Sequence, residues 1–335
     1  MQDAGPSWGG TWPGCFGYHG ECMSGLDVVA VGELNPDLIL DGMAGPPRLG
    51  REILAERATF TLGSSTALCA ANLAALGLSV GIIGKVGADQ FGEFVVQALS
   101  GRGIDVSHVI RDASVRTGVT VSLAYPEDRA MVTYPGAMAH LSAAELDLGY
   151  LTSARHVHVS SLFLQRALQP GCAAVIRQLR TDGLTVSLDP GWDPFEAWDA
   201  GIEGLYGDLN ILFVNRVEAT ALGKDPDWRR AATRLAARVP LVAVKRGPEG
   251  ASVIWGGVWQ DHPGFSVKAV DPTGAGDAFN AGFLLGYLNG WTVEACATWA
   301  NACGALTVGR PGGSGAFAGR TEVEGFIRSQ AGTGA

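Results

Sequence analysis

The stretch 271–282 places small residues directly before a carboxylate and a long apolar helical pattern. Gly274, Ala275 and Gly276 precede Asp277. Glycines permit backbone conformations that a Cβ would obstruct, so successive N–H groups can point to one place at the positive end of a helix macrodipole. We expect a phosphate to bind there and Asp277, on the first helical turn, to accept a proton from an attacking hydroxyl. An anion site beside a base predicts phosphoryl transfer, whereas a glycine-rich turn capped by Asp is the simpler alternative.

An amide and a carboxylate, Asn35 and Asp37, follow the first apolar run of the chain, at 28–31. In open α/β sheets, ligands bind at the edge formed by the carboxyl ends of the strands. The two side chains could therefore hold vicinal hydroxyls of a sugar. An Asx turn at a strand end uses the same residue types.

A second amide and carboxylate, Asn215 and Glu218, follow the apolar run at 211–214. Residues three apart on a first helical turn share a face, so the pair could position metal-bound water near nucleotide phosphates. A helix-capping box, with Asn at the N-cap and Glu at the third helical position, predicts the same letters. From the spacing alone the capping box is favoured.

Short apolar runs alternate with amphipathic segments from Leu26 onward. The runs, predicted as strands, are 28–31, 80–83, 157–159, 186–188, 211–214 and 241–244. The segments predicted as helices include 65–76, 91–99, 172–180, 228–237 and 292–308. Strands without polar alternation are buried on both faces, which indicates a mostly parallel central sheet between two helical layers. The predicted class is α/β, doubly wound.

Three segments, 37–41, 118–124 and 131–134, break this alternation. They have the pattern of antiparallel strands, and their neighbours in sequence belong to the parallel core. We expect a small β lid over a cleft, formed from about 37–43 and 115–134, because a kinase must keep water from the transferring phosphoryl group. An ordinary surface hairpin is the alternative.

The stretch 271–284 closely resembles the second signature of the ribokinase-like carbohydrate kinases, the phosphofructokinase B family. The stretch 62–77 resembles the first signature, but Ser64 stands where the family has its second glycine. Leu68 stands where many members have a substrate-contacting Asn, and Asn72 lies one turn further on. The stretches 85–92 and 133–138 also resemble family segments, and the resemblance extends from Leu26 to about Ile327.

This resemblance implies an enzyme that transfers the γ-phosphoryl group of ATP to a primary hydroxyl of a small, unphosphorylated sugar. By family position, the resemblance assigns catalysis to Asp277 with Gly274, Ala275 and Gly276. It assigns sugar binding to Asn35, Asp37, Gly63 and Ser64. It assigns nucleotide binding to Asn215, Glu218, Lys245, Gly247, Gly250 and Asn301. It further implies Mg²⁺ held through water by Glu218, and a monovalent cation such as K⁺ near Asp271 and Thr273. Asn301 and the stretch 309–315 fall where the family flanks the adenine ring.

Two other functions stay open. A nucleoside kinase of the adenosine type shares the second signature, and nothing in the sequence separates sugar from nucleoside. A non-catalytic sugar sensor on a kinase fold would explain Ser64 and Leu68, although it would not need the Asp277 loop. Phosphosugar acceptors are disfavoured because the lid has no Lys/Arg cluster, while Arg129 and Arg116 leave that acceptor class open.

Composition excludes some partners. The 335 residues carry a formal net charge of −9 with no Lys/Arg-rich run, which argues against a nucleic-acid partner. No apolar run is long enough to span a bilayer. The six cysteines form no CxxC pair, which fits a reduced cytoplasm, and Cys296 and Cys303 are expected in the core.

The expected domain organisation is an extension at 1–25, a kinase domain at 26–330 and a tail at 331–335. The extension is rich in Gly, Trp and Pro, so we expect it to be loosely ordered. Family members often dimerise through the lid, so the resemblance implies a homodimer. Trp192 and Trp198 are assigned either to the cleft or to the surface.

Overall fold

The computed structural model describes residues 25–125, 129–310 and 319–331. The predicted N-terminal extension and C-terminal tail therefore lie almost entirely outside the described residues. So do Cys15 and Cys22, and most of the stretch 309–315 assigned to the nucleotide and cation.

The core is one eight-stranded sheet in the order β14-β13-β12-β11-β10-β9-β1-β4. Its strands are β1 Leu26–Val31, β4 Val80–Ile83, β9 Ala154–Ser160, β10 Thr185–Asp189, β11 Ile211–Asn215, β12 Leu241–Lys245, β13 Ala251–Trp255 and β14 Val258–His262. Neighbouring strands from β4 to β12 are parallel, and β13 and β14 add an antiparallel hairpin at one edge. The six predicted strands are confirmed, and their apolar side chains are buried.

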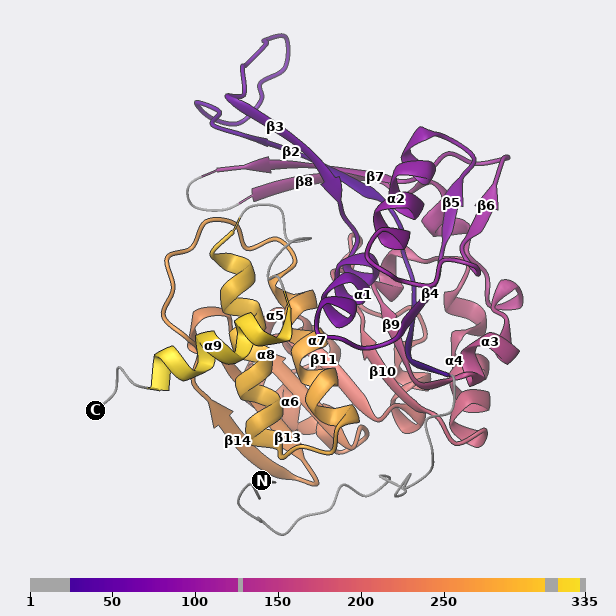
Figure 1. Ribbon diagram of the computed structural model, residues 1–335, viewed down its shortest axis with the longest axis vertical. Helices are drawn as coiled ribbons and strands as arrows, with labels where there is room; N and C mark the ends of the chain where they lie inside the picture. Colours follow the sequence, from indigo (N-terminus) through magenta and orange to yellow (C-terminus); the bar gives the residue numbers. More distant parts are fainter. Residues whose placement is uncertain (1–24, 126–128, 311–318, 332–335) are drawn as a thin grey trace.

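Helices cover both faces of this sheet, as predicted (Figure 1). One layer contains α1 Ser65–Ala75, α2 Gln90–Ser100, α7 Ala275–Leu288, α8 Val293–Val308 and α9 Arg320–Ala331. The other contains α3 Leu148–Thr152, α4 Gln169–Thr181, α5 Arg216–Gly223 and α6 Trp228–Ala236. Each layer packs against one face of the sheet and forms a separate hydrophobic cluster there. In a doubly wound fold, this packing buries the strands on both faces.

A four-stranded sheet, ordered β3-β2-β7-β8, projects from the core as the lid (Figure 1). Its strands are β2 Pro36–Asp41, β3 Arg57–Leu62, β7 Val119–Ala124 and β8 Arg129–Tyr134. Two antiparallel hairpins, β2/β3 and β7/β8, are joined by a parallel pairing of β2 with β7. Three of these strands were predicted, and β3 was not, because its residues are mostly exposed and carry no buried apolar pattern. A separate pair, β5 Lys85–Gly87 and β6 Ile110–Asp112, is parallel.

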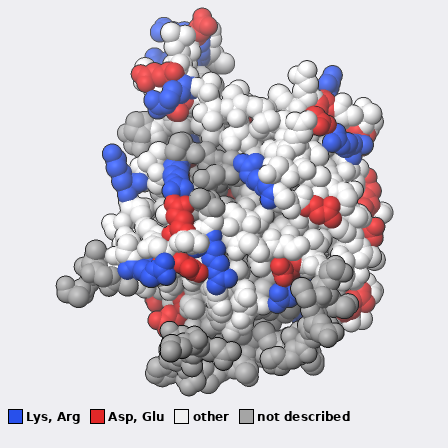
Figure 2. Space-filling view, in the orientation of Figure 1, with Lys and Arg blue, Asp and Glu red and all other residues white. Residues whose placement is uncertain are grey.

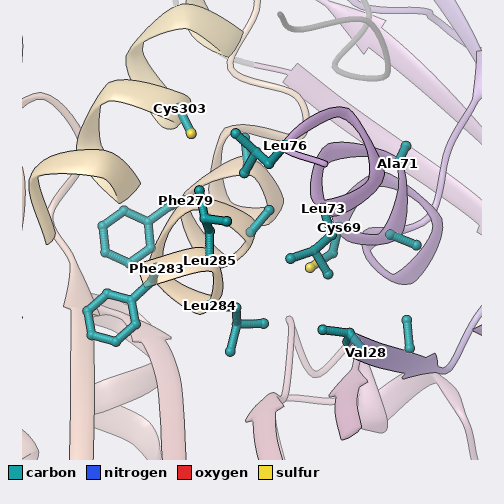
Figure 3. Packing of buried hydrophobic residues seen from close by; sticks show 14 of the residues in the cluster. Val28, Cys69, Ala71, Leu73, Leu76, Phe279, Phe283, Leu284, Leu285 and Cys303 are labelled. Carbon is teal, nitrogen blue, oxygen red and sulfur yellow. The ribbon is translucent and has the colours of Figure 1, made fainter. Parts of the chain in front are cut away.

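Helix α7 lies in the interior, between α1 and α8, and most of its residues are buried (Figure 3). Figure 3 shows Phe279 and Phe283 on one flank of α7, with Leu284 and Leu285 toward α1. At Gly282 a Cβ would lie 2.8 Å from the Trp299 carbonyl oxygen, so the glycine permits the close approach of α8. A helix packed on all sides holds its N-terminal residues in one place, which a catalytic group on its first turn requires.

Lys and Arg are interspersed with Asp and Glu over the face seen in Figure 2. No helix within the described ranges is long and apolar enough to cross a membrane. Cys69, Cys172, Cys296 and Cys303 are buried thiols, so the expected core placement of the last two is confirmed.

Candidate active site

A cavity of about 680 Å³ lies between the lid and the carboxyl ends of the central strands. The lid contributes mainly hydroxyl, carboxylate and guanidinium groups: Asp37, Thr120, Ser122, Arg129 and Thr133. The core contributes residues after β1, β9 and β10 and at the starts of α1 and α7: Glu33, Asn35, Ser64, Ser65, Ser161, Trp192, Thr273, Gly274 and Asp277 among others. The cavity therefore lies at the carboxyl edge of the sheet, the edge at which ligand binding was predicted.

Asp277 is on the first turn of α7 and lines this cavity, as predicted. The helix begins after Gly274, which has a φ of 73°, a left-handed conformation that favours glycine. Burial raises the pKa of the Asp277 carboxyl well above its usual value, and nearby Asp189 and Glu33 add to the shift while Lys245 opposes it. A carboxyl whose pKa is raised in this way is a stronger proton acceptor than an exposed aspartate.

The conformational argument for Gly276 is wrong. Gly276 is helical, without the positive φ found at Gly274. A Cβ at position 276 would find only the flexible end of Lys245, with its Nζ 3.4 Å away. Of these two glycines, only Gly274 has a backbone conformation that requires glycine.

Asn35 and Asp37 form a hydrogen-bonded pair in the cavity wall. Asn35 Nδ2 donates to Asp37 Oδ1 at 3.1 Å and also to Thr120 Oγ1 of the lid at 3.3 Å. Burial and the charge of Glu33 raise the pKa of Asp37 to about 7, although Arg129 counteracts them. Gly63 makes room for this carboxylate, because a Cβ there would lie 2.0 Å from Asp37 Oδ1.

Replacing Gly63 with Ala should raise the KM for the acceptor by about 10- to 100-fold, since the new methyl must displace Asp37 by an ångström or more. Steady-state kinetics with the acceptor and ATP varied separately would measure the effect, and the KM for ATP should change little. Gly204→Ala is the matched control, because a Cβ at Gly204 meets nothing within 4 Å. An unchanged acceptor KM in Gly63→Ala would remove Asp37 from acceptor binding.

Ser64, which stands where the family signature has its second glycine, has a positive φ, which favours glycine. Its φ is 71°, in the left-handed region that a non-glycine residue adopts only when its contacts hold it there. Its hydroxyl donates to the Glu33 carbonyl oxygen at 2.5 Å and accepts from the Ala67 N–H at 3.1 Å. Leu68 lines the cavity, whereas Asn72, although buried, does not line it and so does not replace the missing Asn there.

Asn215 and Glu218 form the capping box of α5. Asn215 Oδ1 accepts from the Glu218 N–H at 2.9 Å, and Glu218 Oε2 accepts from the Asn215 N–H at 2.7 Å. Burial raises the pKa of Glu218 to about 7, against the attraction of Lys245. The structural interpretation of this motif is therefore correct, and a buried carboxylate beside a lysine also leaves a ligand role open.

Lys245 belongs to a buried charge network whose acidic partner, Asp189, sequence reasoning missed. Lys245 Nζ lies 2.5 Å from Asp189 Oδ2, and Asn280 Nδ2 donates to the same oxygen at 2.6 Å. Burial disfavours the charge on each partner, but the ion pair outweighs it, so the pKa of Asp189 is lowered and that of Lys245 is raised. Asp189 ends a buried strand. The principle that selected Asn35, that ligands bind at the carboxyl ends of the strands, would therefore have selected Asp189 as well.

Of the remaining predicted nucleotide residues, Gly250 and Asn301 have close structural contacts and the Cβ position of Gly247 is open. Gly250 has a φ of 91°, and a Cβ there would lie 2.2 Å from the His262 carbonyl oxygen. Gly247 has a φ of 62°, with open space where a Cβ would lie. Asn301 Nδ2 donates to the Pro263 carbonyl oxygen at 3.0 Å, which joins α8 to the segment after β14.

The loop before α7 contacts the lid. Asp271 Oδ1 accepts from the Thr273 N–H at 2.8 Å, and Arg129 Nη1 from β8 donates to Thr273 Oγ1 at 2.6 Å. Arg129 thus lines the cavity, whereas Arg116 is exposed and does not line it. Trp192 also lines the cavity, and Trp198 instead packs edge-on against Trp192, with centroids 5.1 Å apart.

The chain is similar to known carbohydrate kinases. The model of the pfkB family carbohydrate kinases matches residues 26–317. The chain is 36% identical to an ATP-dependent ribose-1-phosphate kinase from Halopiger xanaduensis, over 75% of this chain and 81% of that protein. It is 32% identical to a 2-dehydro-3-deoxygluconokinase from Bacillus subtilis, over 83% of this chain and 90% of that protein.

Among solved structures, one from E. coli, described as a ribokinase II in complex with ATP and Mg²⁺, superposes with a TM-score of 0.80 at 25% identity. The superposition covers 91% of this chain and 99% of that one. Sequence signatures and fold agree, and the chain belongs to the pfkB family of carbohydrate kinases.

Proposed function

We propose that this protein transfers the γ-phosphoryl group of ATP to a primary hydroxyl of a small sugar held under the lid. The observation that supports this most is the placement of Asp277, on the first turn of α7, in the same cavity as the Asn35–Asp37 pair. The cavity thus joins a base, a helix N-terminus for an anion and a hydroxyl-binding pair. A kinase needs these three elements in one enclosed space.

In the proposed reaction, Asp277 takes the proton of the acceptor hydroxyl. The hydroxyl oxygen forms a bond to the γ-phosphorus, the bond from that phosphorus to the β–γ bridging oxygen breaks, and ADP leaves. Negative charge on the transferring group would be met by the N–H groups of Ala275, Gly276 and Asp277 at the start of α7. Removing one such donor typically costs about 3 to 4 kcal/mol of transition-state stabilisation.

Mg²⁺ would arrive with ATP. No group of three or more His, Cys, Asp or Glu side chains converges within the described part of the chain. That fits Mg²⁺, which keeps several waters and takes most other ligands from phosphate oxygens, so one or two carboxylates suffice. The buried Glu218, beside Lys245, would hold the ion through water, with Asn215 fixing its orientation. When bound, the ion neutralises developing charge on the β- and γ-phosphates.

The nucleotide would lie over the β11, β12 and α8 side of the cleft. Lys245, Gly247, Gly250 and Asn301 are proposed to flank the phosphates and the adenine, and Asp271 with Thr273 to hold a monovalent cation such as K⁺. The exposed lid side chains Val132 and Tyr134, 66% and 53% exposed, support the proposal of a homodimer through the lid. A cytoplasmic location remains part of the proposal.

The test is ADP release from Mg-ATP across a panel of ketoses, aldoses, sugar acids, phosphosugars and nucleosides. We expect at least one sugar acceptor to stimulate release, with the product phosphorylated on a primary hydroxyl by NMR. The sequence predicted an acceptor without phosphate, while one relative is named for ribose-1-phosphate, so the panel includes both kinds. Stimulation by nucleosides alone would replace the proposal with a nucleoside kinase, and ATP binding without any transfer would favour the sensor.

A further inference from the structure

The charges lining the cavity are segregated. Its carboxylates, Glu33, Asp37 and Asp277, are buried, with exposed fractions of 4%, 9% and 8%. Its two cations among the described residues, Arg129 and Arg166, come from different elements. Arg129 is on the lid strand β8 and bonds Thr273 beside the start of α7. Arg166 follows the turn after β9, among apolar lining residues.

Arg166 lies on an aromatic surface. Its Cζ is 4.3 Å from the centroid of the Phe195 ring, and Phe163, Leu164 and Trp192 line the same cavity. No carboxylate of the described residues lies within ion-pairing distance of this guanidinium. A cation–π contact on one side leaves the N–H groups of a guanidinium available, in the planar fork that matches a carboxylate or a phosphate.

The surroundings of Arg166 favour an anion over a hydroxyl. Hydroxyl partners are already supplied elsewhere in the cavity, by Asn35 and Asp37 and by the lid residues Thr120 and Thr133. Arg166 is exposed and the Phe195 ring is itself 65% exposed, so the aromatic surface covers one side of the guanidinium while the other side stays open to an incoming anion. Arg129 differs from Arg166 because it is engaged with Thr273 and its charge acts on Asp37.

We propose that Arg166, stacked on Phe195, is a specificity-determining residue that binds an anionic substituent, a carboxylate or a phosphate, of the acceptor sugar. This inference rests on the proposed function and narrows its acceptor class. The anion would lie at the Phe195 wall while the hydroxyl to be phosphorylated lies at Asp277. Neutral sugars would then be poorer acceptors than acidic sugars of the same carbon skeleton.

The test compares matched acceptors: gluconate with glucose, and ribose 1-phosphate with ribose. We expect kcat/KM to be at least about tenfold higher for the anionic member of one pair, and the pair that responds distinguishes carboxylate from phosphate. Arg166→Gln should raise the KM for the anionic acceptor roughly 10- to 100-fold, with kcat nearly unchanged. The preference for the anionic acceptor should thereby be lost. The same variant should leave kcat/KM for neutral acceptors within about twofold. Arg166→Lys, which keeps the charge but loses the fork, should be intermediate.

Arg229→Gln is the matched control. Arg229 also stacks on aromatic rings, with its Cζ 4.7 Å from the centroid of Trp228, but it does not line the cavity. Equal losses for anionic and neutral acceptors in Arg166→Gln, or a neutral sugar as the best acceptor, would overturn the inference while leaving the kinase intact.

A binding experiment separates failure of the inference from failure of the proposed function. Calorimetric titration of the Asp277→Asn protein with each acceptor pair needs no turnover. Tighter binding of the anionic member, lost on adding Arg166→Gln, would support the inference even if no acceptor stimulated ADP release. Equal or weaker binding of the anionic members would reject it.

Discussion

Replacing Asp277 with Asn should lower kcat by about 10²- to 10⁴-fold while the acceptor and ATP still bind. Asn has nearly the same shape and keeps the cavity lining, but it cannot accept the proton of the attacking hydroxyl. Asp277 is 8% exposed and packed at the start of an interior helix, so the substitution should disturb neither α7 nor the lid. We therefore expect turnover to be largely lost while calorimetric titration still detects binding of the acceptor and of ATP.

The matched control is Asp227→Asn. Asp227 caps α6, accepts from the N–H groups of Arg229 and Arg230, and lies outside the cavity lining. Asn caps helices about as well as Asp, so this variant should turn over at the wild-type rate. Turnover of Asp277→Asn within about twofold of wild type would remove Asp277 from the mechanism.

The pH profile tests the same role. Burial, with Asp189 and Glu33, raises the pKa of Asp277 above that of an exposed aspartate. A base works only when ionised, so kcat should fall as pH falls through this raised pKa and level off above it. The acid limb should therefore lie at higher pH than the usual aspartate range and should be absent from the residual rate of Asp277→Asn. A flat profile would argue against a proton acceptor of raised pKa.

Replacing Asp189 with Leu should cost about 3 to 5 kcal/mol of stability, because Lys245 would be left as a buried, unpaired charge. The side chains of Asp189 and Lys245 are 7% and 16% exposed, and Asn280 also loses its acceptor. Denaturant titration followed by circular dichroism would measure the change. The activity should fall as well, since Lys245 lies beside Gly276 and Glu218.

The double variant Asp189→Leu with Lys245→Met separates the two effects. Removing both charges should recover most of the lost stability, because an apolar pair of similar volume is often as stable as a buried ion pair. Activity should stay low, because a positive charge beside the anion site is gone. Asp208→Ala, which breaks an exposed pair with Arg177, is the control and should change stability by less than about 1 kcal/mol. Equal stabilities for Asp189→Leu and that control would show that the buried ion pair does not contribute to the free energy of unfolding.

The sequence predicted the central sheet because its strands are buried on both faces and so consist of uninterrupted apolar runs, such as that of β11. It did not predict β3 or the β13/β14 hairpin. The residues of β3 are mostly exposed, and the hairpin closes the sheet edge by antiparallel pairing, so neither depends on a pattern that a parallel core imposes. For Gly276 the sequence predicted a feature that the structure lacks. The residue is helical, because a glycine in a signature does not imply an unusual backbone conformation.

By itself, the sequence determined the local parts of the site: a helix beginning after Gly274 with Asp277 on its first turn, and Asn35 and Asp37 after the first strand. These follow from interactions between residues near one another in the chain, which local patterns record. Only the tertiary structure brought Asp189 against Lys245, 56 residues later, and Arg166 over Phe195. Such pairs depend on which strands become neighbours and on the paths of the loops. Both are decided by the packing of the entire core, and no local sequence pattern records them.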